Sequence, residues 1–199
     1  MGTTTRRKPK AEIPTIDCCL VTVAVTDSDG NVDEIAFDTS NKVEVEPQIE
    51  TQEAVKLIVK NVLRAQKPES SVLTGNKITL TDNVFNPELV KILQGGTIQY
   101  GTGQNPEIIG YTPPVAGSAD KGTPFVLNCY SAIYNAAGLI TKYEKISYPN
   151  CAGVPVAFGS EDGVFRAPEY TINSAPATGE APYTITYVDE LPAIDDDTD

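Results

Sequence analysis

Short β-branched and apolar segments, separated at close intervals by glycine and proline, constrain this chain more than any other feature. The 199 residues include 15 Gly and 15 Pro, and both residues favour turns. In the segment 183–188, Tyr183, Ile185 and Tyr187 alternate with residues that point the other way. Many short strands beside one helical segment predict a mainly β fold, an antiparallel sandwich or barrel with extended arms or loops.

A hairpin is predicted near the N-terminus. Residues 18–26 read CCLVTVAVT, and the turn sequence Asp27–Asn31 leads into a second apolar segment at 32–38. Asp-Gly and Asn are typical of tight turns between antiparallel strands. The next segment, 39–52, alternates and contains a proline. It predicts an exposed strand or an extended loop with acidic outward positions.

The middle of the chain gives weaker signals. Residues 53–67 combine a helical apolar stripe with dense β-branched content, so the residues alone leave helix and strand open. Within 72–81, Gly75-Asn76 predicts a turn, and Lys77 to Thr81 predicts a strand.

One helix is predicted over residues 87–94. Asn86 is a favoured N-cap, Pro87 suits the first helical position, and Glu88 suits the positive end of the helix dipole. The apolar face is Leu89, Ile92 and Leu93, and Gly95-Gly96 ends the helix.

The remaining chain predicts a loop and then strands. Residues 97–124 are rich in Gly, Pro, Thr and Asn and indicate a strand end followed by a long loop. From Phe125, strands alternating with turns are expected in the segments 125–134, 139–150, 154–176 and 183–191. We therefore expect an N-terminal arm over 1–15, one β-sandwich domain over 16–192 and an acidic C-terminal tail over 193–199.

The charge excludes several functions. The chain has 15 Lys and Arg, 27 Asp and Glu, no His and a net charge of −12. Without histidine there is no Ser-His-Asp triad, no Cys-His pair and no imidazole zinc ligand. The net negative charge argues against sequence-independent binding of duplex DNA, which needs Lys and Arg against the phosphates. A pair of carboxylates is the one comfortable catalytic arrangement left, and no pair stands out. We expect no enzyme activity and no catalytic residues.

No cofactor or metal site is predicted either. Asp27, Asp29, Asn31 and Asp33 alternate as in a calcium loop, but Val32 stands where an EF-hand needs glycine. The glycines at 95–96 and 101–103 lack the Lys-Ser/Thr of a phosphate loop. The four cysteines, Cys18, Cys19, Cys129 and Cys151, match no zinc or redox spacing. Reduced thiols are expected, and a disulfide between distant cysteines stays open.

The ends of the chain differ in charge from its middle. Residues 1–12 carry a net charge of +3, residues 187–199 carry −6, and the residues between carry −9. The two ends are either solvated termini or a charge pair between copies in an assembly. The basic start is not followed by the apolar segment of a signal peptide, and no run approaches the length of a membrane helix. We expect a soluble protein that is cytoplasmic at synthesis and does not bind membrane.

Two blocks, KITLTDNVFNPELVKILQGG at 77–96 and FRAPEYTINSAPATGEAPYTITYVDELP at 165–192, resemble the major tail, or tail tube, proteins of bacteriophages that infect Gram-positive hosts. The tube proteins of phage-like tail particles are close in type. The resemblance extends from about residue 50 to 192. It implies a β sandwich flanked by one helix, here Asn86–Gln94, and a strand over Val55–Lys67.

The resemblance also implies a function. Six copies would join their sheets edge to edge in a closed ring, and rings would stack into a hollow tube, bridged by loops and terminal arms. DNA would pass through the lumen without specific binding, because carboxylates lining it repel phosphate. Expected partners are the protein itself, tail proteins at the tube ends, and a tape measure protein or sheath. The expected location is the virion tail, assembled in the cytoplasm of the host bacterium.

A different class remains open as the alternative. A soluble β-sandwich binding module, such as a capsid decoration or surface adhesion protein, would need an exposed aromatic patch. Five tyrosines are candidates for such a patch: Tyr100, Tyr111, Tyr130, Tyr134 and Tyr143.

Overall fold

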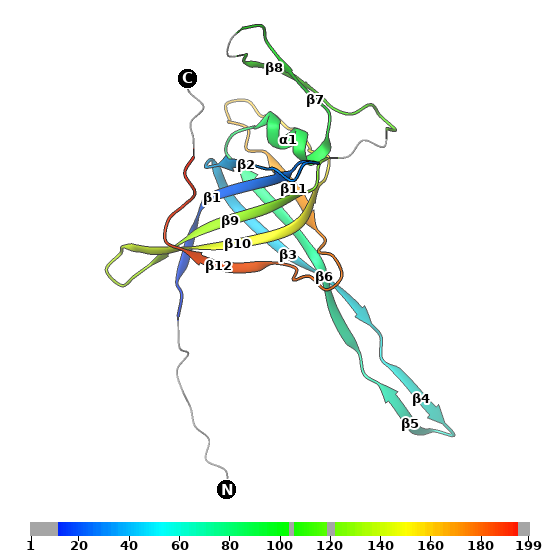
Figure 1. The fold of residues 1–199 in the computed structure, drawn as a ribbon. Helices are drawn as coiled ribbons and strands as arrows, with labels where there is room; N and C mark the ends of the chain where they lie inside the picture. The colour runs from blue at the N-terminus through cyan, green and yellow to red at the C-terminus, as the bar shows by residue number, and fades with distance from the viewer. Residues whose placement is uncertain (1–11, 104–105, 119–121, 195–199) are drawn as a thin grey trace.

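Strands dominate the computed structural model, which describes residues 12–103, 106–118 and 122–194 (Figure 1). The elements found there, in chain order, are β1 (Thr15–Thr26), β2 (Val32–Phe37), β3 (Ser40–Gln52), β4 (Val55–Val59), β5 (Val62–Lys67), β6 (Ser70–Asp82), α1 (Pro87–Gln94), β7 (Thr97–Tyr100), β8 (Ile108–Thr112), β9 (Phe125–Tyr134), β10 (Ile140–Gly153), β11 (Glu169–Ser174) and β12 (Thr184–Val188). The predicted mainly β fold with one short helix is confirmed.

One antiparallel sheet forms the body of the molecule. Its strand order is β2-β1-β9-β10-β11-β6-β3, and β12 pairs with the first half of β10. Strands β10 and β11 share a register of three residues, 151–153, so the sheet folds over at this junction. Inward side chains of β1 and β9 then meet those of β6 and β11. The largest fully buried apolar side chains that the strands contribute to this core are Val21, Val23, Ile78, Leu80, Leu127, Tyr170 and Ile172.

Helix α1 closes one end of this core, with the predicted bounds and cap. The Asn86 side chain accepts hydrogen bonds from the backbone N–H groups of Glu88 at 2.9 Å and Leu89 at 3.3 Å. Gly95, at φ 80°, donates its N–H to the Lys91 carbonyl. The buried helix residues are Leu89, Val90, Ile92 and Leu93. The capping residues thus fix where the helix begins and ends, and its apolar face fixes where it packs.

The predicted N-terminal hairpin is confirmed as β1 and β2. The Asp27 carboxylate accepts hydrogen bonds from the backbone N–H groups of Asp29 and Asn31 and from the Asn31 side chain. Asp27 therefore organises a turn, as an Asx side chain commonly does. Of the two forms predicted for the segment 39–52, the exposed strand is confirmed, as β3.

The turn predicted at Gly75-Asn76 is wrong, because β6 runs through it without interruption. A Cβ on Gly75 would lie 2.3 Å from the Ser174 carbonyl oxygen, so glycine is needed there for close backbone approach. The strand implied for Val55–Lys67 is also corrected. The segment is a hairpin of β4 and β5 whose turn residues, Lys60 and Asn61, have φ values of 51° and 63°. Positive φ at both positions is the geometry of a tight hairpin turn.

Two predictions from the second half of the chain are wrong in part. The expected long loop at 97–124 contains a hairpin of β7 and β8. In the segment 154–176, β11 is the one strand, and residues 154–168 form a loop. The predicted arm over 1–15 and tail over 193–199 lie mostly outside the described residues, so the domain division stays a prediction.

Candidate assembly surfaces

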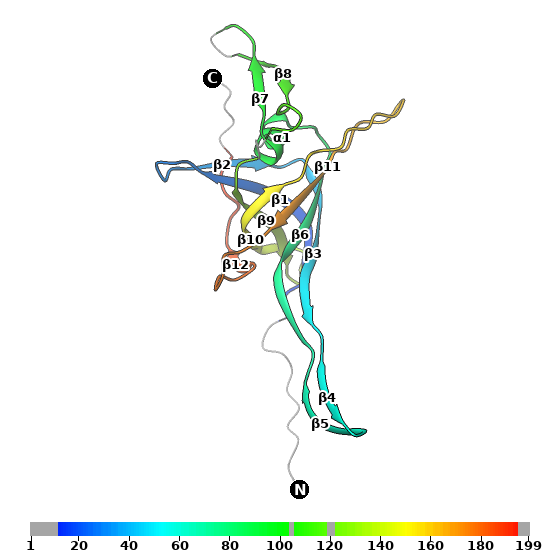
Figure 2. The same cartoon turned by 90° about the vertical axis from the view of Figure 1, so that its right-hand side faces the viewer.

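The most conspicuous surface is a long β ribbon that leaves the body. Strands β3 and β6 pair along their whole length, and β4 and β5 extend the ribbon to a tip far from the core (Figures 1 and 2). Every residue from 44 to 74 is exposed. We call residues 44–74 the arm. No part of the body covers it, so in the free chain it is held by its backbone hydrogen bonds and by a few exposed side-chain hydrogen bonds, such as the one that Lys67 donates to Gln52.

The arm exposes an unusual amount of apolar surface. Its ten exposed large aliphatic side chains are Val45, Ile49, Val55, Leu57, Ile58, Val59, Val62, Leu63, Val72 and Leu73. Five of them, at 57–59 and 62–63, lie at the tip beside the turn. In the register of β4 and β5, Val59 faces Val62 and Ile58 faces Leu63. Cross-strand pairs of this kind leave apolar groups on both faces of the tip, and contiguous exposed apolar surface marks an interaction site.

The arm tip, residues 55–67, also differs in charge from the rest of the described chain. Residues 55–67 contain four basic side chains, Lys56, Lys60, Arg64 and Lys67, and no carboxylate. The other described residues contain 22 carboxylates and six basic side chains. The sequence reasoning missed this contrast because it summed charge over whole segments. A charge count in a window of about a dozen residues would have found it.

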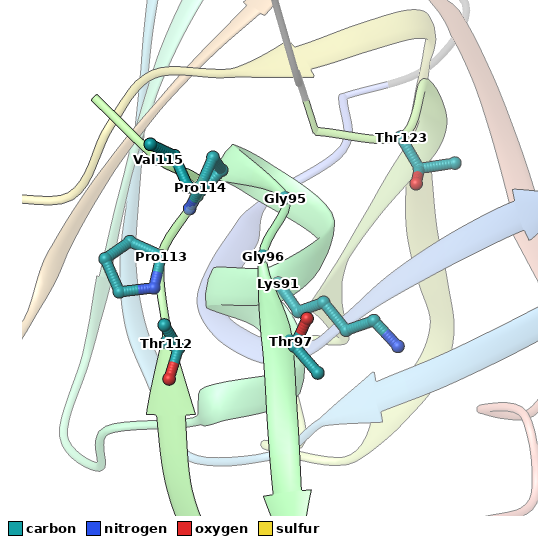
Figure 3. Close-up of a pocket in the computed structure, with 9 residues that line it drawn as sticks. All are labelled: Lys91, Gly95, Gly96, Thr97, Thr112, Pro113, Pro114, Val115 and Thr123. Carbon is teal, nitrogen blue, oxygen red and sulfur yellow. The ribbon is translucent and has the colours of Figure 1, made fainter. Parts of the chain in front are cut away.

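The other end of the molecule carries α1, β2 and the β7–β8 hairpin, opposite the arm tip in both views (Figures 1 and 2). A pocket of about 500 Å³ lies where the β7–β8 hairpin adjoins the C-terminal end of α1 (Figure 3). It is lined by residues at 95–97, 112–115 and 123, and Lys91 is its one charged side chain. Its lining therefore offers no carboxylate to a basic partner.

A second pocket at this end has a lining of apolar and acidic side chains. It has a volume of about 330 Å³ and lies among β1, β2, α1 and β7. Its apolar lining comes from Val25, Ile35, Ile92, Ile98 and Tyr100, and its charged lining from Asp33, Glu88 and Lys91. We call it the upper pocket. A third pocket, near the start of β1, is lined by Pro14, Thr15, Ile16, Asp17, Tyr134 and Gly138.

The sheet has open edges. In the strand order of the described residues, β2 and β3 lie at the two ends, and each pairs with one neighbour. Their outer backbone N–H and C=O groups are available to pair with strands of another chain. Val32 on β2 is 62% exposed, and Glu44 and Glu46 on β3 are exposed.

The five candidate tyrosines lie in different surroundings. Tyr130 is buried, with the Lys145 ammonium 5.6 Å from its ring centroid. Tyr111 donates its hydroxyl to the Gly95 carbonyl and accepts a hydrogen bond from Gln94. Tyr100 is half exposed, and Tyr134 and Tyr143 are half-buried on β9 and β10. These tyrosines hold separate parts of the fold and present no shared aromatic surface.

The cysteines are free thiols in positions that make them unreactive. Burial raises the pKa of Cys129 far above its usual value, and burial raises the pKa of Cys151 to about 11. Burial also raises the pKa of Cys18 and Cys19. Reactive cysteines need a lowered pKa and exposure, so these four are packing residues.

Acidic side chains form no obvious chemical centre. Within the described ranges, no three Asp, Glu, Cys or His side chains come together as a metal site. Hydrogen bonds from the side chain and backbone of Asn31 lower the pKa of Asp27, in keeping with its role in the turn. Over the same part of the chain, no helix is long and apolar enough to cross a membrane.

Comparison with known proteins gives only remote similarity. No protein-family model and no curated protein matches the sequence. Among solved structures, the chain is similar to one in a cryo-EM structure of the anti-feeding prophage baseplate, 6-fold symmetrised, with 11% identity and a TM-score of 0.33. The match covers 89% of this chain and 97% of that chain. At this TM-score the similarity assigns no function.

Proposed function

We propose that this protein is a structural subunit of a phage-tail-like particle, in which it assembles with copies of itself into a tube of stacked, hexameric rings. The two sequence blocks that resemble tail tube proteins support this proposal. One of them spans α1 with the strand before it, and the other spans β11 and β12. The antiparallel β fold with one flanking helix is the architecture that the resemblance implies.

The exposed apolar surface of the arm is the main support for this proposal. A run of exposed residues from 44 to 74, with ten large aliphatic side chains, is costly to leave in water. A soluble monomer would also expose two sheet edges, which invite association. Both features become favourable when neighbouring copies cover the arm and pair with the edges.

The acidic body suits the proposed transport of DNA. Edge-to-edge closure of β2 on β3 of the next copy would form a ring, and ring closure would repeat the body's excess of carboxylates around a lumen. Such a lumen repels phosphate, so DNA passes without being held. In this role the chain has no catalytic residue, cofactor or metal. Its partners are copies of itself and other proteins of the tail. The protein is then a component of the virion.

Electron microscopy of concentrated purified protein tests the proposal. The wild-type chain is expected to form tubes of constant diameter with a central channel. A variant in which Asn-Gly replaces residues 53–69 shortens the ribbon between the paired ends Gln52 and Ser70. It should keep the thermal midpoint of the body and lose the tubes. A wild-type chain that stays monomeric at every concentration contradicts the proposal.

A further inference from the structure

The charge of the arm tip raises the question of what it contacts. Four basic side chains project from residues 55–67 of a chain whose net charge is −12. The same tip exposes Leu57, Ile58, Val59, Val62 and Leu63. A matching surface must therefore offer both apolar contact and carboxylates.

Of the three pockets described, the upper pocket matches best. Asp33 and Glu88 line it together with five apolar or aromatic side chains, and one cation, Lys91, opposes them. The pocket of Figure 3 has Lys91 and no carboxylate. The pocket at the start of β1 has Asp17 alone.

Other carboxylates lie on the elements that supply the lining of the upper pocket. Asp27 and Asp29 stand on the exposed turn between β1 and β2, the two strands that supply part of its lining. Glu34, next to Asp33, is engaged by hydrogen bonds from Thr22 and Asn128. Asp33 is thus the exposed β2 carboxylate on the pocket that is free to meet an incoming cation.

Position in the molecule points the same way. The elements of the upper pocket lie at the end opposite the arm tip (Figures 1 and 2). Two complementary surfaces at opposite ends make a head-to-tail contact, which repeats indefinitely when copies are displaced along one axis.

We propose that the arm tip of one copy docks in the upper pocket of the copy stacked on it, with aliphatic side chains of the tip in the pocket and Lys56, Lys60 or Arg64 against Asp33 and Glu88. The volume of about 330 Å³ lies at the lower end of the range for ligand pockets and accommodates a few aliphatic side chains. This contact rests on the proposed function and assigns its axial, ring-to-ring interface to particular residues.

Matched charge reversals test the contact. Arg64→Glu changes the arm at the one residue of β5 left without a partner in the β4–β5 register, and Asp33→Lys changes the exposed rim of the pocket. Each should raise the critical concentration for tube formation about tenfold or more, equivalent to about 1.4 kcal/mol per tenfold change. The combined chain, Arg64→Glu with Asp33→Lys, should recover most of the loss.

Two controls carry the same changes of charge elsewhere on the body. Lys77→Glu, on β6, matches the arm variant, and Glu161→Lys, in the loop before β11, matches the pocket variant; both side chains are exposed. Neither should shift the critical concentration appreciably. Equal thermal midpoints in dilute, unassembled protein would show that all variants fold.

A second measurement locates the contact directly. Carbodiimide condenses a lysine ammonium with a carboxylate, losing water and forming an amide. In assembled wild-type protein it should join Lys56 or Lys60 to Asp33 or Glu88 of another copy, as mass spectrometry of peptides from mixed heavy and light chains would show. The cross-link should be absent from dilute protein.

The outcomes separate the two proposals. Tubes that form equally well with Arg64→Glu and Lys77→Glu, or that give no such cross-link, overturn this contact and leave the proposed function standing. A wild-type chain that never forms tubes overturns both. Sedimentation of the full chain with phosphatidylserine vesicles, lost in Arg64→Glu while tube formation is unchanged, would assign the basic tip to a lipid surface instead and overturn the contact.

Discussion

The body and the arm are both built from long antiparallel strands, yet they are held together differently. In the body, side chains of β1, β6, β9 and β11 meet in a core with α1 over one end. In the arm the same strands, β3 and β6, continue beyond the body, and both faces are exposed. Identical backbone pairing therefore supports a buried sandwich in one region and an unsupported ribbon in the other.

The difference shows where the stability of each region comes from. Burial of apolar area stabilises the body, whereas an isolated two-stranded ribbon is marginal in water. The arm exposes aliphatic side chains that would be a liability in a monomer. The body's apolar residues are accounted for within one chain, whereas those of the arm are accounted for only by the contacts with neighbouring copies that we propose.

Equal truncations in the two regions should give the largest contrast. Leu80→Ala removes a fully buried side chain of the core and should lower the free energy of unfolding by about 2–5 kcal/mol. Leu57→Ala removes the same atoms from the exposed arm tip and should change it by less than about 0.5 kcal/mol. Urea denaturation of dilute protein measures both values. Similar losses at the two positions would mean that the arm packs on the body in solution.

Alkaline pH should weaken the body alone. The pKa of Cys151 lies near 11 in the folded chain, against a usual value of 9.0. Between these values the unfolded thiol loses its proton and the folded thiol keeps it, so stability is complete below about pH 9 and falls as pH rises toward 11. At about 1.4 kcal/mol per pKa unit, the loss is about 2–3 kcal/mol.

Thermal midpoints measured from pH 8 to 11 check this dependence. Cys151→Ala should be less stable at neutral pH but show a shallower decline, because one buried thiol no longer titrates. The variant with the shortened arm should follow the wild-type curve, since every side chain that it removes is exposed in the folded chain and is not part of the core. A curve altered by shortening the arm would contradict the division between the two regions.

The sequence predicted the parts of the body whose signals are local. Asn86, Pro87 and Gly95 determine α1 through contacts with their own helix, and Asp27 determines the β1–β2 turn through atoms two to four residues away. Such signals can be read from a short window of sequence.

Prediction from the sequence failed where a residue is determined by a distant part of the chain, and where a strand has no buried face. Gly75 resembles a turn residue, but the atom that requires glycine is the carbonyl oxygen of Ser174, on β11. The arm tip gave mixed helical and strand periodicity because neither of its faces is buried. The upper pocket joins residues 25, 33, 88 and 98, and only the fold brings them together.

Close packing around the helix should make the body sensitive to a single added methyl group. A Cβ on Gly153 would lie 2.5 Å from the Leu93 Cα and Cβ atoms, whereas one on Gly159 would meet nothing within 4 Å. Gly153→Ala should therefore cost about 1–3 kcal/mol of stability through overpacking. Gly159→Ala is the matched control and should cost little. Equal stability of the two variants in thermal denaturation would show that α1 is free to shift away from β10.

Removing the helix cap should have the smallest of these effects on stability. It also tests whether α1 contributes to assembly as well as to stability. Asn86→Ala removes the acceptor for the N–H groups of Glu88 and Leu89 and should cost about 1 kcal/mol. Asn86→Asp keeps an acceptor and should retain most of the stability. Because α1 supplies Glu88 and Ile92 to the upper pocket, Asn86→Ala should also raise the critical concentration for tubes, and Asn86→Asp should not. If Asn86→Ala destabilises the chain while tube formation is unchanged, the helix belongs to the body alone and plays no part in receiving the arm.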